Sequence, residues 1–176
     1  MAQINYTKLG LKPILDKVKI IEWNEEAHVE VKQYLPLSKK LEVLTTIIQN
    51  SGDGNGFYNS ARIDFNITLE LIFAYTNIKF TEKQKEDMEK LYDAFYSTGL
   101  AEQIINIIPE EEKAWFNRHV YKSIDKIYEY RNSVYGILDA LKTDYNDLNL
   151  DVDKLRETLA NDENVGFLKE VVDKLV

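Results

Sequence analysis

The residues that decide the fold are Val18-Lys19-Ile20-Ile21-Glu22-Trp23 and His28-Val29-Glu30-Val31-Lys32-Gln33-Tyr34. Both segments are rich in β-branched and aromatic residues, and Asn24-Glu25-Glu26 provides a polar turn between them. In the second segment Val29 and Val31 fall on one face and polar residues fall on the other, which is typical of an antiparallel pair with one buried face. The two segments therefore predict a β-hairpin. Because a lone hairpin is only marginally stable in water, it must dock on the rest of the chain or on another chain.

Beyond Pro36 the apolar residues recur at helical spacing. Residues 60–75 alternate at first as a strand would, but the length of their apolar run favours a helix. The predicted helices span residues 38–51, 60–75, 82–98, 100–108, 110–142, 151–160 and 163–175. We expect a mainly α protein in which the N-terminal β-hairpin docks on a bundle of about six to seven helices, with one long helix near residues 110–142.

Local signals place the ends of several helices. Ser38 is a candidate N-cap for the first helix, and Gly52 would end it. Thr81-Glu82-Lys83-Gln84 is a capping box, and we expect the helix that it opens to run as far as Gly99. Pro109, followed by three glutamates, suits the first turn of the long helix.

We expect one domain over residues 1–176, made of an N-terminal arm and hairpin (1–36) and a helical body (37–176). A chain of 176 residues buries roughly 70% of its unfolded surface, which suits a single domain. The glycine-rich stretch at residues 51–56 predicts a loop. It has neither the ligand spacing of a calcium loop nor the lysine of a phosphate-binding loop.

The composition excludes several classes of protein. The chain has no cysteine, which excludes disulfides, thiol nucleophiles and cysteine-bound zinc. Its formal net charge of −8 argues against direct binding of nucleic acid. No apolar run approaches the ~18 residues of a membrane span, and the N-terminus lacks the pattern of a secretion signal. We expect a cytoplasmic protein that does not associate with membranes.

The titratable residues form no recognisable catalytic or metal site. His28 lies between acids on a predicted strand, and a solvated strand face explains it better than a metal site does. His119 has no carboxylate one turn away, and we expect it to lie partly buried beside Trp115. Asp64 and Glu70 flank apolar positions, so a hydrolase that uses them together with His119 stays an alternative. We predict no enzymatic activity, no cofactor and no bound metal.

Two groups of residues are candidates for binding a partner protein. The hairpin contributes Val29, Val31 and Tyr34, and a row of tyrosines contributes Tyr121, Tyr128 and Tyr135. The seven-residue spacing of these tyrosines places them on one face of the predicted long helix. We favour packing of this row inside the protein. An interface stays the alternative, because tyrosine combines a large contact area with a polar tip.

Three further segments of the chain are Ile4-Asn5-Tyr6-Thr7-Lys8-Leu9-Gly10-Leu11, Val29-Glu30-Val31-Lys32-Gln33-Tyr34-Leu35-Pro36 and Ala74-Tyr75-Thr76-Asn77-Ile78. These segments resemble small proteins encoded among the tail genes of tailed phages of Gram-positive bacteria. A strand pair that leads into a helical bundle is also similar to the tail assembly chaperones. The resemblance implies a non-enzymatic protein of the host cytoplasm that holds the tape measure protein and recruits tail-tube subunits, without any catalytic residue.

The acidic charge leaves a second function open. An anti-defence or regulatory protein of this charge would block a basic site on a host nuclease or DNA-binding protein. For both functions the expected partners are other proteins, either phage tail components or a host factor. Self-association of the chain is also left open.

Overall fold

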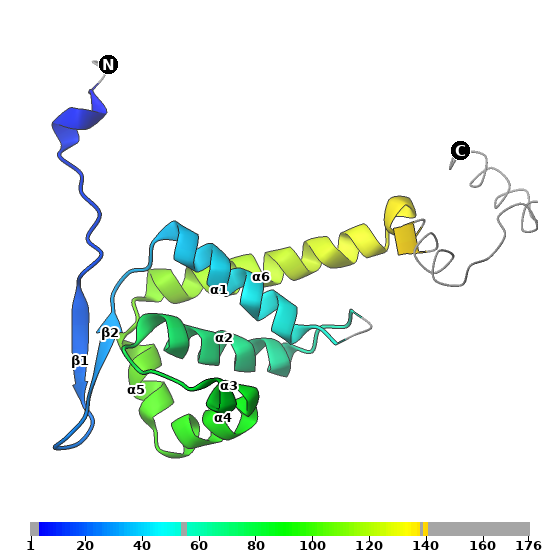
Figure 1. Ribbon diagram of the computed structural model, residues 1–176. Helices are drawn as coiled ribbons and strands as arrows, with labels where there is room; N and C mark the ends of the chain where they lie inside the picture. Colours follow the sequence, from blue (N-terminus) through cyan, green and yellow to red (C-terminus); the bar gives the residue numbers. More distant parts are fainter. Residues whose placement is uncertain (1–3, 54–55, 138, 141–176) are drawn as a thin grey trace, which may run out of the picture. The chain divides into compact units, whose positions relative to one another are not determined.

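The computed structural model describes residues 4–53, 56–137 and 139–140 (Figure 1). These residues form the 3-10 helix η1 (Tyr6–Leu9), the strands β1 (Val18–Glu22) and β2 (His28–Lys32), and the helices α1 (Leu37–Ser51), α2 (Ser60–Tyr75), α3 (Glu82–Glu86), α4 (Met88–Ser97), α5 (Leu100–Ile107) and α6 (Glu110–Arg131). The predicted fold class, mainly α with an N-terminal hairpin and one long helix, is confirmed. The helices predicted at 151–160 and 163–175 lie outside the described residues.

The chain divides into two compact units, Met1–Lys126 and Ile127–Val176. The first unit contains the hairpin, helices α1 to α5 and the first part of α6. Most of the second unit lies outside the described residues, so the single domain expected over 1–176 stays a prediction.

The hairpin forms where the alternating pattern predicted it. β1 and β2 pair antiparallel, with Val18 opposite Lys32 and Glu22 opposite His28. The predicted polar turn closes through Asn24, whose Oδ1 accepts hydrogen bonds from two backbone N–H groups of the turn, at 3.0 and 2.8 Å. Ile21, Val29 and Val31, which share one face, are buried, and the other residues of the two strands are exposed or half-buried. The hairpin therefore has one buried face, as predicted.

Helix α1 begins one residue before the predicted N-cap. Pro36 occupies the cap position, and its carbonyl oxygen accepts from the backbone N–H of Lys40 at 3.0 Å. Ser38 therefore lies within the first turn, and its prediction as the N-cap is wrong. Proline has no side-chain acceptor, and α1 accordingly begins without a side-chain cap. The predicted end of α1 at Gly52 is confirmed.

The helix predicted over residues 60–75 is confirmed as α2. Asn59 caps it, because its Oδ1 accepts from the backbone N–H of Ala61 at 2.9 Å. Eight residues of α2 are buried, and they do not keep to one narrow stripe. This broad burial explains why the apolar pattern of the segment lacked a clear helical period: a helix covered on several sides needs apolar residues on several faces.

The capping box at Thr81 is confirmed, but the helix after it is shorter than predicted. The Thr81 N–H donates to Gln84 Oε1 at 2.9 Å, and the Gln84 N–H donates to Thr81 Oγ1 at 3.3 Å. A single helix to Gly99 is wrong, since α3 ends before Asp87 and α4 begins after it. The Asp87 carboxylate accepts from the backbone N–H of Lys90 at 3.3 Å, so this residue caps a new helix instead of continuing the old one.

Helix α6 begins after Pro109, as predicted, but it ends at Arg131 and does not continue toward residue 142. Ser133 Oγ donates to the backbone oxygen of Tyr130 at 2.6 Å and accepts from the N–H of Gly136 at 3.1 Å. The serine side chain thus replaces backbone bonds that a continuous helix would need. Residues 141–142 lie outside the described residues.

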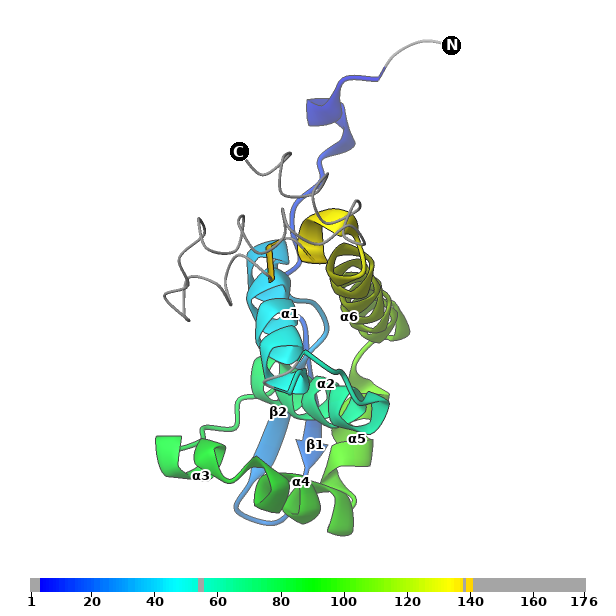
Figure 2. The same ribbon diagram turned by 90° about the vertical axis from the view of Figure 1, so that its right-hand side faces the viewer.

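A buried carboxylate lies at the centre of the first unit. Glu112, in the first turn of α6, is only 7% exposed, and Lys40 of α1 is 6% exposed. Glu112 Oε1 accepts from Lys40 Nζ at 2.6 Å, while its Oε2 accepts from the hydroxyl of Tyr75 at 2.7 Å and from the N–H of Leu35 at 3.2 Å. These contacts join α1, the end of α2 and the segment after β2 to the start of α6. Figure 2 shows α1 beside α6, as the ion pair requires.

We predict that Glu112→Gln lowers the free energy of unfolding by about 3 kcal/mol or more, because it leaves the Lys40 ammonium buried without its partner. Glu110→Gln removes the same charge from an exposed pair with Lys113 and serves as the matched control, with a loss of about 1 kcal/mol or less. Urea unfolding followed by circular dichroism measures both. Equal losses in the two variants would contradict a central role for Glu112.

We also predict a pH effect from Tyr75. Burial, followed by its hydrogen bond to Glu112, raises the pKa of the Tyr75 hydroxyl above its usual value of about 10. The unfolded chain therefore releases this proton at a lower pH than the folded chain does. The resulting stability is fully present below about pH 10 and is lost as the pH rises further. Unfolding midpoints should fall more steeply above pH 10 in the wild type than in Tyr75→Phe, and parallel curves would contradict the assignment.

Candidate functional site

The longest exposed apolar stretch in the described part of the chain precedes the hairpin. Every residue from Ile4 to Ile20 is exposed. Six large apolar side chains between Ile4 and Leu15 are between 42% and 72% exposed: Ile4, Tyr6, Leu9, Leu11, Ile14 and Leu15. We name residues 4–15 the N-terminal apolar segment. Exposed apolar surface of this extent is typical of interaction sites, because a chain gains free energy by covering it.

Local structure within the N-terminal apolar segment is confined to η1. Asn5 Oδ1 accepts from the backbone N–H of Thr7 at 3.1 Å, and Gly10 ends the short helix with a φ of 59°. η1 contains no buried residue. The sequence pattern by itself predicted only an arm before the hairpin. The sequence does carry one signal for an exposed apolar segment: large apolar residues are frequent there, but their spacing follows neither a helix nor a strand.

β1 presents a backbone edge that no other described residue pairs with. Lys17 O accepts from the Gln33 N–H at 2.9 Å, and the Trp23 N–H donates to Ala27 O at 3.1 Å, so the odd-numbered residues of β1 face β2. The N–H and C=O groups of Val18, Ile20 and Glu22 therefore point to the opposite side.

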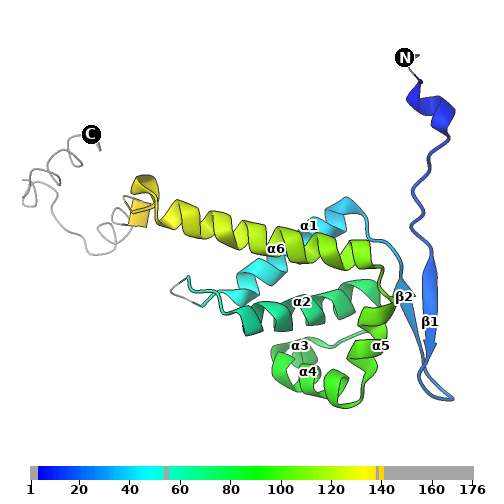
Figure 3. The ribbon, with the colours of Figure 1, turned by 180° about the vertical axis from the view of Figure 1, so that it is seen from behind.

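The outer edge of β2, in contrast, is covered. The Glu30 N–H donates to Asn77 Oδ1 at 3.0 Å, and Glu30 O accepts from the Asn77 N–H at 3.3 Å. Val31 also forms an isolated antiparallel bridge with Thr76. The two strands thus differ: β2 is enclosed by the chain, and β1 forms the margin of the sheet (Figure 3).

The three hairpin residues proposed as a binding site have different surroundings. Val29 and Val31 are buried in the first unit, with Val31 completely inaccessible. Tyr34 is partly exposed, and the Lys40 ammonium lies 4.6 Å from the centre of its ring. The apolar side chains that the two strands present to solvent are instead Val18 and Ile20 of β1, which the sequence pattern did not single out.

The three tyrosines of the predicted row do not share one helix. Tyr121 is exposed, and its hydroxyl donates to Asp64 Oδ1 at 3.0 Å within the first unit. Tyr128 is half-buried and, with Tyr135, belongs to the second unit. Tyr135 is 79% exposed and follows the end of α6, so its seven-residue spacing from Tyr128 does not place both on one helical face. The row predicted over all three residues is therefore wrong, because the helix ends at Arg131. A role of each tyrosine in binding stays a prediction.

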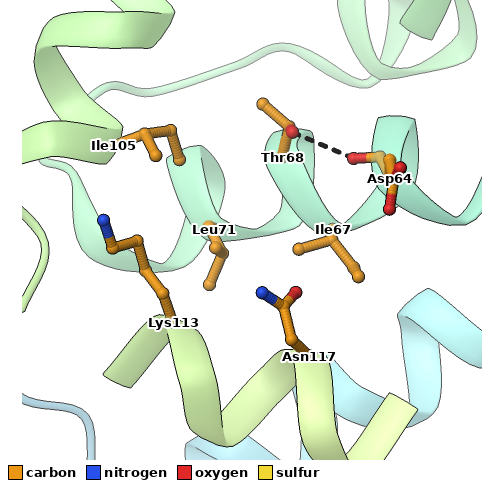
Figure 4. Close-up of a pocket in the computed structure, with 7 residues that line it drawn as sticks. All are labelled: Asp64, Ile67, Thr68, Leu71, Ile105, Lys113 and Asn117. Carbon is orange, nitrogen blue, oxygen red and sulfur yellow. Dashed lines mark hydrogen bonds between the residues drawn. The ribbon is translucent and has the colours of Figure 1, made fainter. Parts of the chain in front are cut away.

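An open groove of about 200 Å³ lies within the first unit (Figure 4). Its lining residues come from α2, α5 and α6: Asp64, Ile67, Thr68, Leu71, Ile105, Lys113 and Asn117. The hydroxyl of Thr68 donates to the backbone oxygen of Asp64 at 2.9 Å, and Lys113 pairs with Glu110 at 2.9 Å. The charged groups of Asp64 and Lys113 lie at different ends of the groove (Figure 4). The groove thus brings together no acid–base pair.

The remaining titratable candidates occupy structural positions. His119 stacks on Trp115, with ring centres 4.2 Å apart, and its Nδ1 lies 2.7 Å from the Trp115 carbonyl oxygen. Its predicted partial burial beside Trp115 is confirmed. His28 lies 4.0 Å from Glu30 on the exposed strand face. Burial raises the pKa of Glu70, against the opposing charges of Lys85 and Lys39. Among the described residues no three acids or histidines form a group suited to a metal ion.

Comparison with known proteins adds no relative. No family model, curated protein or solved structure matches this chain. Within the described ranges, no helix has both the length and the apolar character that crossing a membrane requires.

We predict that Val31→Asp abolishes cooperative folding, because it places a charge without a partner at a fully buried position. Val18→Asp is the matched control, since it makes the same replacement on the exposed face, opposite Lys32. We expect it to change the free energy of unfolding by about 1 kcal/mol or less. Thermal unfolding followed by circular dichroism distinguishes the two. A cooperative transition in Val31→Asp would show that the hairpin is not part of the core.

Proposed function

We propose that this protein is not an enzyme and acts by binding other proteins, most concretely as a tail assembly chaperone for the tape measure and tail-tube proteins of a tailed phage, in the host cytoplasm. The observation that carries the proposal is the N-terminal apolar segment. Its six exposed apolar side chains precede a hairpin whose own buried side chains are Ile21, Val29 and Val31.

The mechanism follows from this division between a closed core and an exposed segment. The core of the first unit has its own buried ion pair and does not need the N-terminal apolar segment to complete it. The segment is therefore available to cover apolar stretches of a partner until assembly replaces it. Because apolar contact is not directional, one such segment suits the long, repetitive surface of a tape measure protein.

A second candidate function rests on the net charge of −8. An acidic anti-defence or regulatory protein would occupy a basic site on a host nuclease or DNA-binding protein, and electrostatic attraction would dominate its affinity. The two candidates differ in their response to salt. Apolar contacts persist at high ionic strength, whereas attraction between exposed charges is screened.

The test is co-expression with the tape measure and tail-tube proteins of the gene cluster that encodes this chain. We expect the wild type to co-purify with one of them in ~0.5 M NaCl, where exposed charges are strongly screened. The double variant Leu11→Asp/Ile14→Asp should reduce recovery at least roughly tenfold, because it removes two apolar contacts. The double variant Lys8→Gln/Lys12→Gln changes the net charge by the same amount and should retain binding.

Each result decides between the candidates. Recovery of neither tail protein by the wild type would overturn the chaperone proposal. Equal loss in both double variants would assign the effect to charge and would overturn the role of apolar contact. Far-UV circular dichroism checks that all variants keep the fold, as expected for substitutions at exposed positions.

A further inference from the structure

The backbone N–H and C=O groups on the free edge of β1 are placed so that the strand can pair with a second copy of itself. The outward N–H and C=O groups belong to Val18, Ile20 and Glu22, all of them even-numbered. Two copies of β1 aligned antiparallel form hydrogen-bonded pairs only when even-numbered residues face each other. β2 separates this edge from the end of α2 (Figures 1 and 3), and no backbone group of another described residue hydrogen-bonds to it.

Charge restricts the register of such a pair. With the two-fold axis at Ile20, this residue faces its own copy and Val18 faces Glu22 of the other copy, so no like charges are opposed. An axis at Lys19 would oppose two lysines, and an axis at Glu22 would oppose two glutamates. An axis at Val18 would place Lys17 opposite Lys19. Opposed like charges destabilise a strand pair, and these registers are therefore disfavoured.

The exposed face of β1 supports the same arrangement. Val18 and Ile20 are both exposed there, while their neighbours on β2 along this face are His28, Glu30 and Lys32. Pairing two copies around Ile20 joins four apolar side chains into one cluster with polar residues on both sides. An apolar centre with a polar rim is the usual anatomy of a protein interface.

We propose that the protein forms a two-fold symmetric dimer in which the β1 strands of two copies pair antiparallel around Ile20, making a four-stranded sheet. This inference does not depend on the proposed function, because it uses the edge of β1 and leaves residues 4–15 free. The strands are short, so the pair buries little area and the dimer is weak, with a dissociation constant in the roughly micromolar range.

The first test is sedimentation equilibrium of the full chain over a range of concentrations. Ile20→Lys brings two ammonium groups together at the axis and should weaken the dimer at least roughly tenfold. Within its own hairpin the new side chain lies opposite Glu30, which supports the fold. Ile20→Thr keeps a β-branched residue at the same place and is the control, with a much smaller effect.

The second test uses mixing. Ile20→Glu alone should weaken the dimer to a similar extent, and an equimolar mixture of Ile20→Lys and Ile20→Glu should dimerise more tightly than either variant alone, because opposite charges then meet at the axis. Amide hydrogen exchange gives an independent signal. Protection of the Ile20 N–H should rise with protein concentration, whereas the Ile21 N–H, which faces β2, should be protected throughout.

A wild type that stays monomeric at 1 mM, on the order of a thousand times the expected dissociation constant, would overturn the proposal. Dimerisation that Ile20→Lys leaves unchanged, in a variant with a normal unfolding midpoint, would place the contact elsewhere. A mixture that fails to dimerise would exclude the axis at Ile20. Dimerisation strengthened by Ile20→Lys alone would overturn it in favour of an axis at Ile21, where residue 20 faces Glu22 of the other copy.

Discussion

The constraint on which the first unit depends is the burial of the Glu112 carboxylate. Removing a carboxylate from water costs several kcal/mol unless its oxygens are paired. Here the two oxygens accept from an ammonium, a phenol and a backbone N–H. These donors belong to Leu35, Lys40 and Tyr75, each of which lies 37 or more residues from Glu112 in the sequence. The carboxylate is stable only when α1, α2 and the segment after β2 meet at the start of α6.

This constraint also determines which strand of the hairpin is enclosed. Leu35 follows β2 closely, so the bond from its N–H to Glu112 holds the end of that strand against the helices. Asn77 and Thr76 then cover the outer edge of β2. β1 is held by its pairing with β2 and by contact with α5, and Ile21 is its one buried side chain. The described residues that precede β1 are consequently exposed.

The two proposed interaction surfaces follow from this asymmetry and do not compete. The N-terminal apolar segment offers side chains, and its binding would be driven by apolar burial. The edge of β1 offers backbone N–H and C=O groups at every second residue, and the hydrogen bonds that a partner strand forms with them would be directional. In an antiparallel dimer the two β1 strands begin at opposite ends of the sheet. The two N-terminal apolar segments would therefore leave the sheet in opposite directions, which suits a partner longer than one copy of the protein.

Local signals in the sequence were sufficient for the hairpin, the capping box at Thr81 and the start of α6 at Pro109. In each case the deciding interaction joins residues a few positions apart. The same reasoning missed the break at Asp87 and the end of α6 near Ser133, since a polar side chain that bonds its own backbone is compatible with a helix until the geometry is known.

The sequence by itself determined the class of fold, the positions of most elements and the absence of cysteine chemistry. Only the tertiary structure decided which charged residues are buried and which large apolar residues face water. Lys40 and Glu112 are charged, as surface residues usually are, and both are buried. Leu11 and Ile14 are apolar, as core residues usually are, and both are exposed. Burial depends on which distant segments meet, and the periodicity of a single segment does not contain that information.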